Sequence, residues 1–276
     1  MEALADATLN GGTVSVRKRV EVSPGIHLIP SARWSRIYLI VGETLTLVDS
    51  GLPSRPNRVP KYIRSIGRHE DELRHILITH SHPDHTGMTS VLAKATGASV
   101  VVHRADTVRL DRNRLALGYT GLLGKVTSPI PGFSRVDVGT LVEDGDVLPI
   151  HGGVRVIHTP GHTRGSVCFL LEESKVLFSG DTIFSDGRQI SRSVPFPGYD
   201  RDSYVRSLKR LSEFEFEGLF GGHGSPMLEG GSHVLGQLLE SHPEPPTWGD
   251  FFGSIPRRFK RSFPMTGEYH FKHRRE

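Results

Sequence analysis

The segment Thr79 to His85, with the sequence Thr-His-Ser-His-Pro-Asp-His, constrains this chain more than any other stretch. It carries four metal-binding side chains within six positions. Imidazole nitrogens and carboxylate oxygens suit zinc best, and iron, manganese and cobalt are possible alternatives. A helix would spread these side chains around its surface, whereas a loop can fold them onto one point. Such crowding has little structural use, so the segment predicts a metal centre built on a loop.

The flanking sequence places this loop. The apolar run that ends at Ile76–Thr79 predicts a buried strand, and Thr86–Ala95 predicts a helix closed by Gly97. Open sheets of this kind bind ligands outside the carboxyl ends of their strands, where loops can carry polar groups. The predicted metal centre therefore lies at the end of a strand.

Further potential ligands follow much later in the chain, at His162, Asp181 and His223. With the first cluster they make five histidines and two carboxylates. This set exceeds the four ligands that one tetrahedral zinc uses, so the sequence predicts two metals and metal-assisted hydrolysis.

Short apolar and β-branched runs predict strands at Thr13–Val22, Arg36–Val41, Thr44–Val48, Ile76–Thr79, Ser99–His103, Val154–His158, Ser166–Leu171, Lys175–Ser179 and Leu219–Gly221. Helices are predicted at Pro60–Ile66, Thr86–Ala95, Asp200–Leu211 and Gly231–Leu239. The sequence alone thus predicts a mixed α and β protein.

Five motifs in order resemble the signature motifs of the metallo-β-lactamase superfamily, from about Val20 to Leu239. They are Val48–Gly51, His80–His85, Thr159–Thr163, Phe178–Thr182 and Gly221–Gly224. The resemblance implies an α+β fold, an αββα sandwich of two mixed β-sheets flanked by helices, with the site at one edge.

The resemblance also implies a role for each matching residue. The first metal would be bound by His80, His82 and His162, the second by Asp84, His85 and His223, and both by the bridging carboxylate Asp181. Asp49 matches a residue that orients a ligand imidazole or a bound water through a hydrogen bond. An ordinary role for Asp49, as a turn residue at the end of a strand, remains open.

The predicted cofactors are two Zn²⁺ ions, with iron, manganese or cobalt possible. Two adjacent cations lower the pKa of a bridging water from about 15.7 towards 7, so hydroxide can act as the nucleophile at neutral pH. The predicted catalytic residues are Asp84, as a proton shuttle, and Asp49. Serine and cysteine nucleophiles are not needed.

The predicted substrate is a small thioester, ester or lactone, because Gly180–Phe184 resembles the corresponding stretch of the glyoxalase II group. N-acyl homoserine lactonases typically have tyrosine three residues after the bridging aspartate, where this chain has Phe184. Lactonase activity, β-lactamase side activity, ribonuclease or phosphodiesterase activity and a non-enzymatic metal-binding sensor remain alternatives.

The segment from Phe184 to Tyr199 follows the bridging aspartate and should pass near the metals. Its candidate substrate contacts are Phe184, Arg188, Arg192 and Tyr199. Either arginine is suited to pair with a substrate carboxylate, and salt bridges within the fold are the alternative. Residues 110–136 predict either an apolar flap over the site or a helical hairpin packed on the core.

Residues 1–240 of the 276 are expected to form one hydrolase domain, followed by a basic, aromatic extension at 241–276. The extension has a net charge of plus three, from seven Lys and Arg against four Asp and Glu. We expect it to dock on the body or on a second copy as a homodimer. Binding of nucleic acid or an acidic membrane surface is the less favoured alternative.

The lone cysteine, Cys168, lies in an apolar run and should be a buried core thiol. The amino terminus lacks the apolar core of a secretory signal, and the sequence has no run of the roughly 18 apolar residues that a membrane span needs. A single cysteine cannot form an internal disulfide, which fits a reducing compartment. The expected location is therefore the cytoplasm.

Overall fold

The structure is a computed structural model of the whole chain. It describes residues 21–30, 35–53, 57–107, 110, 135–193, 195 and 198–241. Most of the predicted first strand and of the predicted flap at 110–136 lies outside these residues. So does the extension after residue 241, and with it the predicted docking, dimer, nucleic-acid and membrane roles.

The described strands form three sheets. The first has the order β1 (Glu21–Ser23), β2 (Ile26–Leu28), β3 (Tyr38–Val41), β4 (Leu45–Val48), β5 (Leu73–Leu77), β6 (Ser99–His103), β7 (Thr140–Val142). The second has the order β14 (Gly218–Gly221), β11 (Val176–Gly180), β10 (Val167–Leu171), β9 (Val154–His158), β8 (Val147–Leu148). The third has the order β13 (Ile190–Arg192), β12 (Ile183–Asp186), β15 (Gly224–Ser225).

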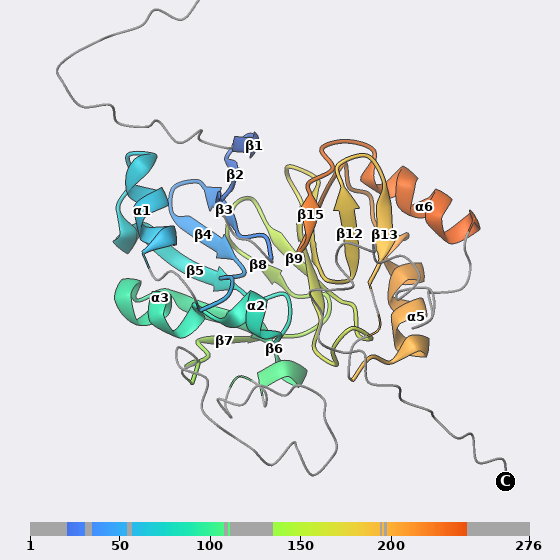
Figure 1. Cartoon of the computed structure of the whole chain (residues 1–276), viewed down its shortest axis with the longest axis horizontal. Coiled ribbons are helices and arrows are strands. Elements are labelled where there is room, and N and C mark those ends of the chain that lie inside the picture. Colours follow the sequence, from blue (N-terminus) through green and yellow to red (C-terminus); the bar gives the residue numbers. More distant parts are fainter. Residues whose placement is uncertain are drawn as a thin grey trace, which may run out of the picture.

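Helices flank the two larger sheets. The described helices are α1 (Arg58–Ser65), η1 (Glu70–Glu72), α2 (Pro83–Thr86), α3 (Thr89–Thr96), η2 (Arg104–Asp106), α5 (Arg201–Leu211) and α6 (Gly231–Ser241). Figure 1 shows α1 and α3 on one side of the strands and α5 and α6 on the other. The expected αββα sandwich is confirmed.

Three hydrophobic cores lie between these layers. They form because successive side chains of a strand point into different cores. In β10, Phe169 points into the core between the two large sheets, while Cys168 points into the core beneath α5 and α6. In β3, Leu39 joins the core beneath α1 and α3, and Ile40 joins the central core. Because successive side chains of a strand face opposite sides, a strand covered on both faces must be apolar throughout.

Several predicted details changed. The helix expected at Thr86–Ala95 is α3, which begins at Thr89, and Gly97 follows its end with a φ of 75°. The loop expected to carry the ligand cluster is partly helical, because Asp84 and His85 lie in α2, which Gly87 and Met88 separate from α3. The third sheet was not predicted, because its strands are only two to four residues long. Cys168 is confirmed as a buried core thiol. Among the described residues, no helix combines the length and apolar character that crossing a membrane requires.

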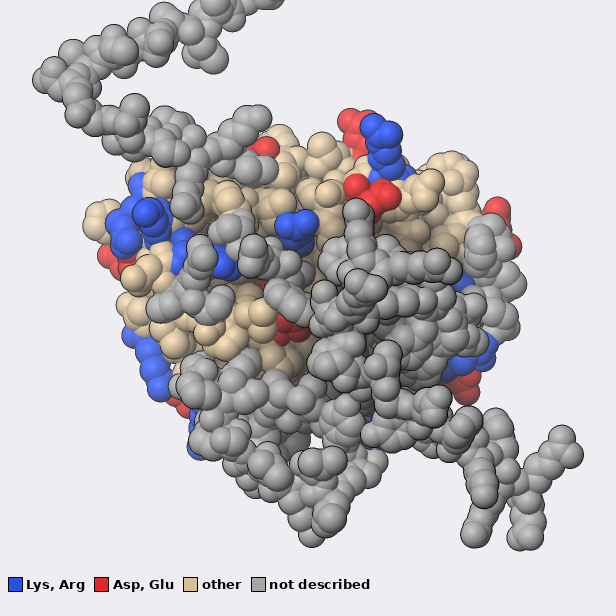
Figure 2. Space-filling model, viewed as in Figure 1, with Lys and Arg blue, Asp and Glu red and all other residues tan. Residues whose placement is uncertain are grey.

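Charged side chains pair at the surface. Figure 2 shows basic and acidic groups next to one another at several places on the visible face. Arg210 lies 2.5 Å from Asp144, and Arg104 lies 3.0 Å from Glu143. Such exposed pairs contribute about 0–1 kcal/mol each, so the cores dominate the stability of this fold.

Candidate metal centre

The structure brings all seven predicted ligands together. They stand after β5, in and before α2, and in the loops that follow β9, β11 and β14. The backbone N–H of Val167 donates to the carbonyl of Thr79 over 2.9 Å, which joins the second sheet to the first beside the site. The ligand atoms form two neighbouring groups: His80, His82, His162 and Asp181, and then Asp84, His85 and His223.

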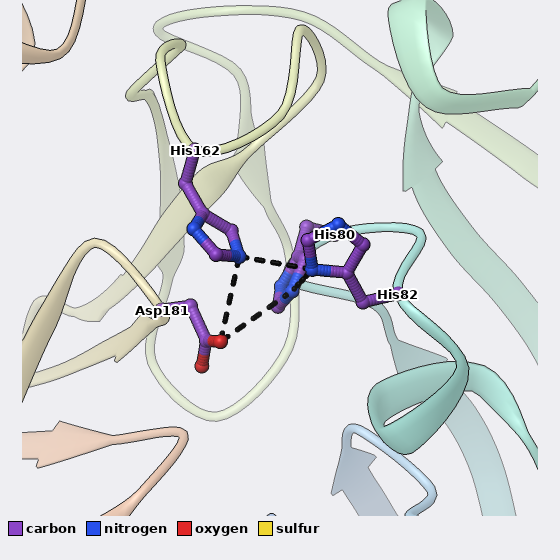
Figure 3. A group of neighbouring side chains, drawn as sticks. All are labelled: His80, His82, His162 and Asp181. Carbon is purple, nitrogen blue, oxygen red and sulfur yellow. Dashed lines mark hydrogen bonds and ion pairs between the residues drawn. The ribbon is translucent and has the colours of Figure 1, made fainter. Parts of the chain in front are cut away.

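In the first group three imidazoles converge on one point. His82 Nδ1 lies 3.1 Å from His80 Nε2 and 2.9 Å from His162 Nε2. Asp181 Oδ2 completes the group, 3.4 Å from His162 Nε2 and 3.9 Å from His80 Nε2. Figure 3 shows the four side chains pointing toward one another, with His80 and His82 on one loop and His162 and Asp181 on two others. Three nitrogens and one oxygen are a ligand set that zinc accepts.

The second group uses the other oxygen of the same carboxylate. Asp181 Oδ1 lies 3.2 Å from His85 Nε2 and 3.3 Å from His223 Nε2. Asp84 Oδ2 lies 3.6 Å and 3.4 Å from the same two nitrogens. Since one oxygen of Asp181 faces each group, this side chain has the placement that a bridging ligand needs.

Two buried polar atoms indicate that a cation fits here. His85 Nε2 and Asp181 Oδ1 are buried, and although they lie 3.2 Å apart, neither makes a hydrogen bond in the described part of the chain. Burying such atoms without a partner is costly, and a cation between them would satisfy both. The donor set and these two atoms therefore fit a metal centre.

The electrostatics of the two groups differ. Burial lowers the pKa of His162 to about 3 and holds the pKa of His80 well below its ordinary 6.5, so both imidazoles are neutral, as ligands must be. Burial also opposes a proton on His85, but the neighbouring carboxylates, Asp181 first among them, outweigh it and raise its pKa. The second group thus attracts positive charge, which a bound cation would supply.

Asp49 supports both groups from behind. Its Oδ2 accepts a hydrogen bond from His85 Nδ1 over 2.7 Å and another from the hydroxyl of Thr79 over 2.8 Å. That hydroxyl lies 3.1 Å from His80 Nδ1. Asp49 is 2% exposed and has a φ of 58°, a conformation uncommon for residues other than glycine. Asp49 thus occupies a turn and is also hydrogen-bonded to His85, so its orienting role stays a prediction that this geometry allows.

His162 has a support that the sequence did not reveal. Its Nδ1 lies 2.8 Å from Ser193 Oγ, and the backbone N–H of Ser193 donates to the hydroxyl of Tyr204 over 2.7 Å. The Tyr204 hydroxyl donates in turn to the carbonyl of Thr182 over 2.7 Å. Ser193 is 31 residues from His162 in an irregular segment, so no sequence pattern connects the two.

Gly222 makes room for the shared carboxylate. A Cβ atom at this position would lie 2.4 Å from Asp181 Oδ1 and 2.6 Å from His85 Cε1, both closer than real contacts allow. The backbone N–H of Gly222 donates to the carbonyl of Gly180 over 2.7 Å, which holds the two ligand loops side by side. Only glycine allows this approach.

The four residues predicted to contact the substrate lie in different places in the fold. The ring of Phe184 lies edge-on to His223 with centroids 5.3 Å apart, so it borders the second group. Arg188 is exposed in the turn between β12 and β13. The buried Arg192 donates to the carbonyl of Leu238 in α6 over 3.4 Å, and Tyr199 packs against Tyr204 with centroids 5.3 Å apart.

Arg192 therefore turns away from the ligands. Ser193, the next residue, reaches His162, and successive residues of an extended segment point to opposite sides. The contacts of Arg192 and Tyr199 lie with the helices that cover the second sheet. Of the four candidates, Phe184 is the one whose described contacts lie beside a ligand group, and the roles of Phe184 and the exposed Arg188 stay predictions.

Known proteins resemble the chain in sequence and in structure. The family model described as the metallo-beta-lactamase superfamily matches residues 35–223. Human acyl-coenzyme A thioesterase MBLAC2 is 32% identical over 210 residues, covering 68% of this chain and 71% of that protein. The hydroxyacylglutathione hydrolase of Rhodospirillum rubrum is 36% identical over 115 residues, covering 42% of this chain but only 36% of that enzyme.

A solved structure, TTHA1623 in a di-iron-bound form, superposes with a TM-score of 0.58 at 28% identity. The match covers 76% of this chain and 94% of that one. The family model spans more than half of the chain, from residue 35 to the last of the seven clustered ligands, His223. This chain therefore belongs to the metallo-β-lactamase superfamily.

Proposed function

We propose that this protein is a hydrolase of small thioesters that works with two zinc ions. The observation that carries the proposal is the placement of Asp181, with Oδ2 facing one group of ligands and Oδ1 the other. A carboxylate placed in this way suits a pair of cations rather than a single one.

Cations bound at these ligands would supply hydroxide at neutral pH and polarise the acyl oxygen of a substrate. The chain itself holds the ligands in place and handles protons. Asp84 Oδ2 lies within 3.6 Å of both histidines of the second group, and its side chain is 23% exposed. It can therefore accept a proton at the site and pass it to water or to the leaving thiolate.

The proposed substrate class rests on two of the relatives. MBLAC2 is a thioesterase for acyl-coenzyme A, and hydroxyacylglutathione hydrolase is named for a thioester of glutathione. A thiolate is a good leaving group and needs little help from a general acid. This agrees with a site in which Asp84 is the more exposed of the two candidate ligand carboxylates, at 23% against 8% for Asp181.

Phe184 argues against efficient lactone hydrolysis. Its ring borders His223, where a tyrosine hydroxyl would be able to donate a hydrogen bond to the developing oxyanion. Loss of such a donor at comparable sites costs on the order of 3 kcal/mol. We expect Phe184→Tyr to raise lactone turnover more than thioester turnover.

The test combines metal analysis with a substrate panel. Purified protein should contain two metals per chain and hydrolyse acyl-coenzyme A or S-lactoylglutathione faster than acyl homoserine lactones or nitrocefin. His223→Gln should lower both metal content and activity, whereas His233→Gln, at an exposed position of α6, should change neither. Saturation at one metal with full activity would refute the two-metal proposal. A kcat/KM on lactones at or above about 10⁴ M⁻¹s⁻¹ would make lactonase the better assignment.

A further inference from the structure

We propose that Asp106 is a positioning residue that holds the two histidine loops of the first ligand group in register. It lies in η2, directly after β6, and is 1% exposed. Strand β6 runs parallel to β5, so the carboxyl ends of both strands meet at the same edge of the sheet. Asp106 therefore stands beside the loop that follows β5.

The carboxylate of Asp106 accepts hydrogen bonds from both loops. Oδ2 accepts from the backbone N–H of Ser81 and from the hydroxyl of Thr163, each over 2.8 Å. Oδ1 accepts from the backbone N–H of Gly165 over 2.9 Å. Ser81 stands between His80 and His82 in the sequence, and Thr163 directly follows His162. One buried side chain thus connects the neighbours of all three histidines of the first group.

The fit around Asp106 is close. A Cβ atom at Gly165 would lie 2.6 Å from the backbone nitrogen of Asp106 and 2.7 Å from its Cγ. Thr163 is held from its other side as well, because its hydroxyl lies 2.8 Å from Ser166 Oγ and its backbone N–H donates to the same oxygen over 3.0 Å. The loop that carries His162 and Thr163 therefore has little freedom to shift while these hydrogen bonds are made.

Loop position matters more for His82 than for the other two histidines. His82 presents Nδ1 to the group, whereas His80 and His162 present Nε2. Nδ1 is closer to the main chain than Nε2, so a given rotation of the side chain moves it less and compensates less for a displaced backbone. Fixing Ser81 N–H fixes the backbone from which His82 starts. Partners that orient ligands in this way typically change metal affinity 10- to 100-fold.

The inference rests on the proposed metal centre but not on the proposed substrate. The informative variant is Asp106→Asn, which keeps the shape but has one oxygen, so at least one of the three donors would face an NH₂ group. Asp200→Asn is a matched control. The carboxylate of Asp200 also accepts from two backbone N–H groups and one hydroxyl, those of Asp202 and Ser203, at the start of α5.

Zinc affinity should be measured by competition with a chromogenic chelator. A His223→Ala background removes a ligand from the second group only, so the tighter dissociation constant reports the first group. In this background we expect Asp106→Asn to weaken zinc binding about 10- to 100-fold and Asp200→Asn to change it less than about twofold. Circular dichroism and thermal unfolding, recorded in parallel, show whether each variant is folded.

Folded Asp106→Asn with unchanged zinc affinity would overturn the inference, even if its melting temperature were lower. If this variant does not fold, Thr163→Val removes one donor to the same carboxylate. It should weaken zinc binding at least about twofold, the effect of losing one hydrogen bond, and unchanged affinity would again overturn the inference. A parent chain that binds no zinc would refute the metal centre itself, and this outcome is visible before any change at Asp106.

Discussion

Replacing Asp49 with asparagine should weaken metal binding by both groups of ligands. The carboxylate accepts from His85 Nδ1, from the hydroxyl of Thr79 and from the backbone N–H of Thr79, at 2.7, 2.8 and 2.9 Å. Asparagine keeps the shape but offers one oxygen and an NH₂ group. Whichever way the amide is turned, at least one of these donors meets another donor.

The two orientations have different consequences, and each is unfavourable. With NH₂ toward Thr79 N–H, a buried donor loses its partner. With NH₂ toward His85, the imidazole can accept that hydrogen bond only if its proton moves to Nε2, the atom that faces Asp181 and the second group. A hydrogen bond to a charged group contributes about 1.5–3 kcal/mol, which corresponds to roughly 10- to 150-fold in affinity.

The assay is zinc titration with elemental analysis of the dialysed protein. Asp49→Asn should lose metal from the second group first and bind the other metal more weakly than the parent. Thr79→Val is the matched control, because it removes the hydroxyl between Asp49 and His80 but leaves the bond to His85 in place. It should therefore weaken the first group alone. Two metals bound to Asp49→Asn with the parent's affinities would show that this hydrogen bonding does not govern the site.

Three further predictions each concern a single residue. Ser193→Ala removes one neutral hydrogen bond to His162 and should weaken metal binding at the first group about 2- to 10-fold in the same titration. Gly222→Ala places a methyl group against Asp181 and should lower metal content and cost about 1–3 kcal/mol in the free energy of unfolding, measured with urea. Burial raises the pKa of Cys168 from 9.0 to about 11, so the unfolded chain loses this proton first and stability should fall as the pH rises through this range. Between neutral pH and about pH 10, the free energy of unfolding should therefore fall by about 1 kcal/mol less in Cys168→Ala than in the parent protein, as urea unfolding would measure.

The clustering of the seven candidate ligands could be predicted from the sequence because their motifs are local. Four of the seven ligands stand within His80–His85, and the others stand in short motifs beside glycines that the turns require. The strands next to these motifs are mainly apolar, and β10 and β11, which lie between two covered layers, are buried along their whole length. The placement of the site at the ends of strands followed from the same pattern.

The residues that hold the ligands in place, Ser193 and Asp106, could not be predicted from the sequence for a physical reason. Ser193 and Asp106 act through hydrogen bonds to residues 31 and at least 25 positions away, and a lone serine or aspartate in a connection has no periodicity that marks it. The direction of Arg192 was equally hidden, since it depends on a strand of only three residues. Short strands carry too few alternating positions to show which side faces the core.

The seven ligands are shared between the two large sheets. The four within His80–His85 follow β5 of the first sheet, and the three later ones follow β9, β11 and β14 of the second. During synthesis, the first half of the chain can therefore present only an incomplete set, and high-affinity binding must await the second half. A metal bound at this site would join the two sheets late in folding, so a chain folded without metal should have two halves that separate more readily.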